Sequence, residues 1–205
     1  MSSLKNLYFH KAMGYKFIDE ISLKNSSFFM DLDSLNRCVK SCELCSLSKS
    51  RKTPLILSSK SADIMVIFKS PNETQNLKAD IKACKNTLKF CNTLYEIFKN
   101  YKISYSFLLK CYGNYDEISV SMCKDYLFEE IEKLSPKLIL TMGELVSRVV
   151  LKSSVSFDSL KGSLFKYKYS LIMPLDSLDY ILKNPSKKDE FIESIKRAKE
   201  FIKTP

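Results

Sequence analysis

Four cysteine residues have the spacing of a metal-ligand set. Cys42 and Cys45 form a Cys-x-x-Cys pair, and Cys111 and Cys123 follow far downstream. The turn between the paired cysteines can point both sulfur atoms the same way, so that the pair holds one metal centre. Four thiolates complete either a tetrahedral zinc site or a cubane iron–sulfur cluster. The residues therefore predict a metal centre at these four cysteines, and their spacing leaves both metals open.

The cysteine content and the N-terminal sequence bear on the compartment. Seven cysteines are an odd number, and the first residues lack the positive start, apolar core and cleavage site of a secretory signal. This combination favours a reducing compartment over a disulfide framework. The sequence also contains no apolar run of the ~20 residues that a membrane span needs. We therefore expect a cytoplasmic protein that does not enter a membrane.

The charge of the chain favours a polyanionic partner. The formal net charge is +10, with 33 lysine and arginine residues against 23 acidic ones. Arginine, which makes bidentate contacts to phosphate and guanine, occurs at only four positions. We therefore expect weak, non-specific DNA binding in which lysines act as point charges on the phosphate backbone.

Short apolar runs alternate with helical patterns along most of the chain. This alternation predicts one α/β domain with a mostly parallel sheet over residues 38–205. Residues 1–37 are interpreted as an N-terminal extension, rich in aromatic residues, that could bind a protein partner. Strands are expected at 62–68, 105–109 and 137–142, a strand or hairpin at 165–173, and helices at 31–49, 78–100, 119–134, 143–150 and 186–203.

Several further segments occur in a fixed order around the four cysteines. Together they resemble the family-four uracil-DNA glycosylases, the iron–sulfur branch of that superfamily, from about residue 38 to residue 202. The matching segments are Cys42-x-x-Cys45-x-Leu47-x-x-x-Arg51, Ala62-Asp-Ile-Met-Val-Ile67, Lys110-Cys111, Cys123-Lys-Asp-Tyr-Leu127 with Pro136-Lys137, Leu160-Lys-Gly162, and Tyr180-Ile-Leu-Lys-Asn-Pro185.

The resemblance implies a cofactor, a fold and a partner. It implies a 4Fe–4S cluster, in preference to zinc, on the four cysteines, and a three-layer α/β/α domain. It also implies a DNA-facing side that carries Arg51, Lys69, Lys161 and Lys183. Lys161 and Lys183 stand where the family has arginine, so the positive charge is kept without the bidentate fork.

The positions that carry catalysis in the family are changed in this chain. Lys69 replaces the carboxylate that handles the water, Phe107 replaces the asparagine that reads the uracil edge, and Ser177 replaces the histidine that stabilises the departing base. These changes predict a protein that has lost uracil excision and serves as an accessory in DNA repair or replication. The alternative is an active DNA glycosylase that removes uracil or another damaged base in a remodelled pocket. In that case the Lys69 amine could attack the sugar carbon and form a Schiff base.

Overall fold

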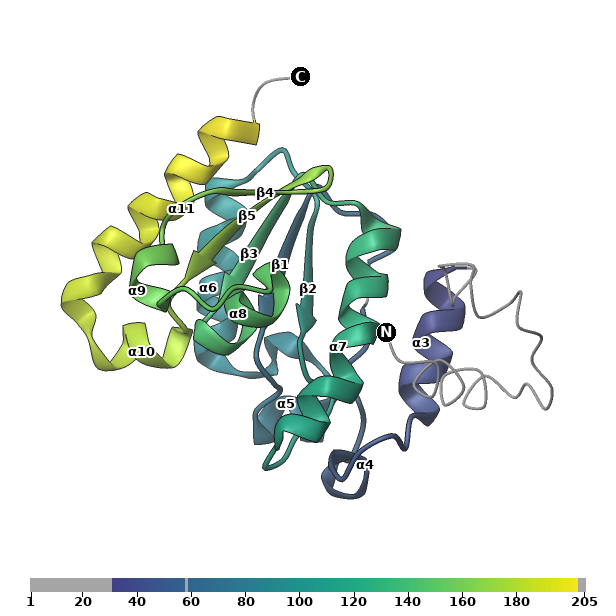
Figure 1. The fold of residues 1–205 in the computed structure, drawn as a ribbon. Coiled ribbons are helices and arrows are strands. Elements are labelled where there is room, and N and C mark those ends of the chain that lie inside the picture. Colours follow the sequence, from purple (N-terminus) through teal and green to yellow (C-terminus); the bar gives the residue numbers. More distant parts are fainter. Residues whose placement is uncertain (1–30, 58, 203–205) are drawn as a thin grey trace.

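A five-stranded sheet forms the centre of the protein (Figure 1). The computed structural model describes residues 31–57 and 59–202. The strand order is β2-β1-β3-β5-β4, in which neighbouring pairs are parallel except for the antiparallel pair of β4 and β5. The predicted α/β class with a mostly parallel sheet is confirmed. The strands are β1 (Ile64–Phe68), β2 (Ile103–Phe107), β3 (Leu138–Met142), β4 (Phe165–Tyr167) and β5 (Ser170–Leu175).

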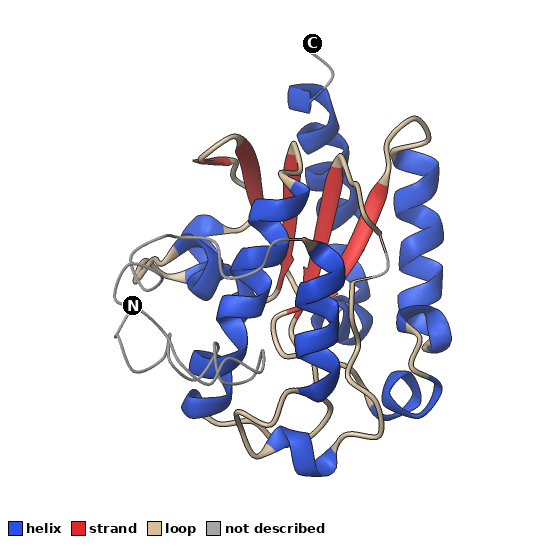
Figure 2. Cartoon of the chain, turned by 90° about the vertical axis from the view of Figure 1, so that its right-hand side faces the viewer, coloured by secondary structure: helices blue, strands red, loops and turns tan. Residues whose placement is uncertain are grey.

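Helices cover both faces of this sheet and make three layers (Figures 1 and 2). Among the described residues, no helix is long and apolar enough to cross a membrane. The helices are α3 (Leu32–Ser41), α4 (Leu47–Ser50), α5 (Glu73–Lys78), η1 (Ile81–Ala83), α6 (Lys85–Ile97), α7 (Glu117–Leu134), α8 (Glu144–Leu151), α9 (Phe157–Leu160), α10 (Leu178–Lys183), η2 (Pro185–Lys187) and α11 (Lys188–Ile202).

The side chains of each central strand alternate between two separate cores. Met65 and Ile67 of β1 belong to the core that α3, α7 and α8 cover. Val66 and Phe68 point the other way, into the core under α6 and α11. A parallel strand that is covered on both faces must be apolar at every position, which explains the uninterrupted apolar run of β1.

The structure differs from the expected helix boundaries in two places. A single helix was expected over residues 31–49, but α3 ends at Ser41 and Cys42 is extended, with φ −65° and ψ 130°. Asp31 caps α3, because its carboxylate accepts the Ser34 amide hydrogen bond. The helix expected over residues 78–100 begins only at Lys85, after α5 and η1.

Two other expectations concern the C-terminal part of the sheet and the N-terminal extension. A strand or hairpin was expected at residues 165–173, and β4 and β5 form a hairpin there. Most of the predicted N-terminal extension lies outside the described residues, and α3 crosses its predicted boundary after residue 37. Leu35 and Val39 of α3 are buried in the same core as α7, so this helix packs as part of the domain.

Candidate metal centre

The four predicted ligands line one pocket at the side of the sheet. Cys42 and Cys45 lie in the turn between α3 and α4, Cys111 lies in the loop after β2, and Cys123 lies in α7. Apolar side chains complete the wall of the pocket. These are Val39, Leu44, Leu47, Met122 and Tyr126. Three segments that are far apart in the sequence therefore bring four thiols to the same place.

Local structure explains why the loop that carries Cys111 lies against α4. Ser50 donates a hydrogen bond from its hydroxyl to the Tyr112 carbonyl oxygen over 2.8 Å. Gly113 follows with φ +141°, and a Cβ atom at this position would lie 2.4 Å from the Ser50 Oγ. The conformation and the close approach both require glycine here. The loop is therefore held against the turn that carries the Cys-x-x-Cys pair.

Hydrogen-bond donors reach two of the four sulfur atoms. Arg51 Nη1 donates to Cys111 Sγ over 3.4 Å, and its Nη2 donates to the Lys40 carbonyl oxygen over 3.1 Å. The backbone amide of Lys110 donates to Cys123 Sγ over 3.3 Å. Tyr126 lines the same pocket as Cys42. N–H and O–H donors to ligand sulfur atoms are one of the ways in which proteins tune thiolate-bound metals.

Burial favours the neutral form of two thiols of this pocket, those of Cys111 and Cys123. Burial raises the pKa of Cys111, against the opposing effect of the Arg51 guanidinium. Burial raises the pKa of Cys123 to about 12, although the Lys110 amide hydrogen bond and ammonium charge act in the opposite direction. Metal binding at these sulfur atoms would therefore release protons.

The donor set fits an iron–sulfur cluster in its chemistry, because four thiols, an apolar wall and sulfur-directed donors occur together. The free space between the side chains is small, about 10 Å³, which is close to one water molecule. In the described part of the chain, no three His, Cys, Asp or Glu side chains converge to hold a single ion.

The three positions that the resemblance assigns to catalysis lie at or shortly after the carboxyl ends of parallel strands, where α/β proteins place their sites. Lys69 follows β1, is exposed, and places its Nζ 5.3 Å from the centre of the Tyr115 ring. Phe107 ends β2 and is buried, and its ring lies 5.8 Å from that of Phe68. Ser177 follows β5 and caps α10, because its hydroxyl accepts the Tyr180 amide hydrogen bond.

The four basic residues expected to face DNA have different surroundings. Lys69 and Lys183 are exposed. Lys161 Nζ lies 2.8 Å from Asp158 Oδ1, and this hydrogen bond raises the pKa of Lys161. The Arg51 guanidinium is turned toward the cysteine pocket. Two of the four cations are therefore already paired within the protein.

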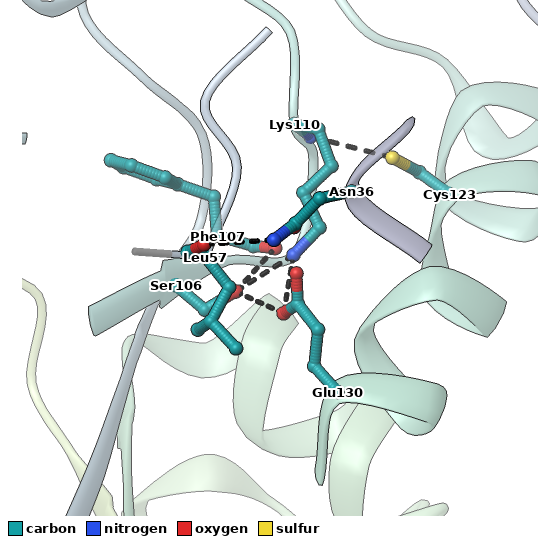
Figure 3. A network of polar contacts seen from close by, with 7 residues as sticks. All are labelled: Asn36, Leu57, Ser106, Phe107, Lys110, Cys123 and Glu130. Carbon is teal, nitrogen blue, oxygen red and sulfur yellow. Dashed lines mark hydrogen bonds and ion pairs between the residues drawn. The ribbon is translucent and has the colours of Figure 1, made fainter. Parts of the chain in front are cut away.

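A buried polar network beside the cysteines was not predicted from the sequence (Figure 3). Lys110 Nζ lies 2.6 Å from Glu130 Oε2 and 2.7 Å from Ser106 Oγ, and Ser106 also donates to Glu130. All three side chains are buried. A lysine directly after an apolar run is typical of a strand that ends in solvent, so local sequence carries no signal for this network.

No protein-family model matches the chain, and the comparison with curated proteins finds no match. The resemblance to family-four uracil-DNA glycosylases therefore stays a prediction from the sequence motifs.

Proposed function

We propose that this protein is a uracil-DNA-glycosylase-like, iron–sulfur-binding protein that associates with DNA, has lost uracil excision, and serves as an accessory in DNA repair or replication. One contrast within the fold carries the proposal. Four thiols share a pocket with sulfur-directed donors. The positions that would carry catalysis are instead occupied by an aromatic ring, a surface ammonium and a helix cap.

The thiol pocket supports the metal part of the proposal. Cys42, Cys45, Cys111 and Cys123 would hold the cluster, and Arg51 and Lys110 would donate hydrogen bonds to two of its sulfur ligands. A bound cluster supplies a cross-link between the α3–α4 turn, the loop after β2 and α7. Because such ligation is coupled to folding, its main contribution here is stability.

The aromatic packing at the sheet edge supports the loss of excision. Hydrolysis of an N-glycosidic bond needs an extruded base in a shaped pocket, a stabilised leaving anion and a positioned water. Phe107 packs against Phe68, which in turn packs edge-on against Phe90 at 6.3 Å, so rings fill the base-reading position. Losing general acid–base help costs typically ~10²–10⁴-fold, and losing one donor to the developing anion costs ~10²–10³-fold. These effects together would remove most of the rate enhancement.

The remaining positive surface supports the DNA part of the proposal. Lys69 and Lys183 are exposed. Lys69 directly follows β1, and Lys183 is the last residue of α10, the helix that follows β5. A lysine ammonium is a point charge, so such contacts favour weak affinity, little sequence preference and a strong dependence on salt. The net charge of +10 acts in the same direction.

The test combines three measurements on anaerobically purified protein. We expect iron and sulfide near four of each per chain, binding of duplex DNA at low salt, and no detectable excision from uracil-containing DNA. Excision at ~1 s⁻¹ or faster would overturn the proposed loss of activity. Borohydride trapping on DNA with damaged bases tests the active-glycosylase alternative, because an amine nucleophile such as Lys69 would leave a covalent adduct. Colourless, soluble, zinc-loaded protein would overturn the iron assignment.

A further inference from the structure

Lys110 contacts the thiol pocket with its backbone and a buried carboxylate with its side chain. Its amide donates to Cys123 Sγ over 3.3 Å, and the next residue in the chain is Cys111. Its ammonium, in a side chain only 2% exposed, pairs with Glu130 of α7 over 2.6 Å. Figure 3 shows these contacts within one continuous network. A single residue therefore links the two downstream cysteines to the middle of α7.

The carboxylate end of this pair is itself fixed. Glu130 lies on α7 seven residues after Cys123, which is about two helical turns along the same side of the helix. Ser106, at the end of β2, hydrogen-bonds both the Glu130 carboxylate and the Lys110 ammonium. The Lys110 side chain thus attaches the loop after β2 to α7 through Glu130, and to β2 through Ser106.

Stability alone does not explain why an ion pair is buried at this place. Burial of an ion pair is expensive in desolvation, and apolar residues of similar volume often replace such pairs at no loss of stability. If the Lys110–Glu130 pair orients the loop after β2, its burial has a reason that does not depend on stability.

We infer that Lys110 is a positioning residue, which through Glu130 holds Cys111 and the Cys123 sulfur in the arrangement that receives a metal centre. The role in receiving a metal centre rests on the proposed function, whereas the positioning of the loop rests on the contacts of Lys110 described above. Its first consequence is local: loss of the pair should expose Cys111 and Cys123 without unfolding the domain. Its second is that the altered protein should retain less iron.

The test is alkylation of the metal-free protein with iodoacetamide, followed site by site with mass spectrometry. Lys110→Met combined with Glu130→Leu removes both charges, so neither is left unpaired. Cys91 serves as an internal reference, because it is buried in α6, a helix that packs on the opposite side of the sheet. We expect labelling of Cys111 and Cys123 to become at least tenfold faster, while labelling of Cys91 is unchanged.

A matched control removes a different buried polar pair from the core beneath the same face. Thr141 Oγ1 and Ser147 Oγ lie 2.8 Å apart, and both side chains are fully buried. Thr141→Val with Ser147→Ala should leave the labelling of Cys111 unchanged. Ser106→Ala keeps both charges, and it should accelerate labelling of Cys111 by a smaller factor than the charge-free variant.

The outcomes separate this inference from the proposed function. Equal acceleration at Cys91, Cys111 and Cys123 would reduce the pair to a general contribution to stability and overturn the inference, as would unchanged labelling. Iron content is measured in parallel on anaerobically purified protein, where the charge-free variant should hold less than half the iron of the wild type. If the wild type contains no iron, the proposed function fails, while the labelling pattern still decides the positioning role.

Discussion

Breaking the Lys110–Glu130 pair from one side should cost more stability than removing it altogether. Lys110→Met leaves Glu130 without its counter-charge in a place where its side chain is fully buried. Within the described residues, Glu130 Oε1 already has no hydrogen-bond partner, so the carboxylate has little other support. The Ser106 hydroxyl would be the contact that remains. The same reasoning applies to Glu130→Leu, which leaves the Lys110 ammonium without its counter-charge.

The burial of the pair sets the expected magnitude. Removing one partner of a buried ion pair costs about 3–5 kcal/mol, whereas replacing both by apolar residues is often neutral or stabilising. The expected loss is a large part of the 5–15 kcal/mol that is typical of a folded domain. At about 2–4 °C per kcal/mol for a chain of this size, each single variant should melt roughly 6–20 °C lower than the wild type. The double variant should melt near the wild type.

Chemical unfolding in urea, followed by circular dichroism, measures this cycle. All four proteins should be compared metal-free and at one pH, because a bound metal would add its own stabilisation. We expect the double variant to lose less free energy of unfolding than either single variant. If the losses of the two single variants simply add up in the double variant, the two side chains do not act as a pair, and the reasoning is refuted.

Three further predictions concern the metal, DNA and pH. Cys111→Ala should lose iron and melt at a lower temperature than the iron-loaded wild type, because ligation adds stability to the folded domain, while Cys91→Ala keeps its iron; equal iron in the two variants would contradict the ligand assignment. Removing Lys69 and Lys183 together should lower the slope of log K against log salt on duplex DNA by about 1.8, and removing two lysines of α11 should lower it less. No binding at low salt would instead favour a protein partner. Burial raises the pKa of Asp176 in the folded protein, so its ionisation opposes folding as the pH rises. Asp176→Asn should therefore gain stability over the wild type between pH 4 and pH 7 in urea unfolding, and a gain that shrinks over this range would reverse the assigned sign.

The fold class could be predicted from the sequence because it depends on local patterns. The uninterrupted apolar run that became β1 indicates a strand covered on both faces, and the structure confirms this. Asp31 could be recognised as a helix cap because its carboxylate reaches an amide only three residues away. The sequence also predicted Cys42, Cys45, Cys111 and Cys123 as one set, and all four line one pocket. Only the spacing of Cys42 and Cys45 is a local signal.

The surroundings of the site were decided by contacts between distant segments. The helix expected over residues 31–49 is interrupted at Cys42, where the chain turns so that both cysteines of the pair reach the pocket. Arg51 was expected to face DNA, but its guanidinium lies against Cys111, which is brought there by the loop after β2. The α/β pattern could be read within windows of a few residues. The partners of Arg51, Lys110 and Glu130 could not, because folding brings these residues together across long separations in the chain.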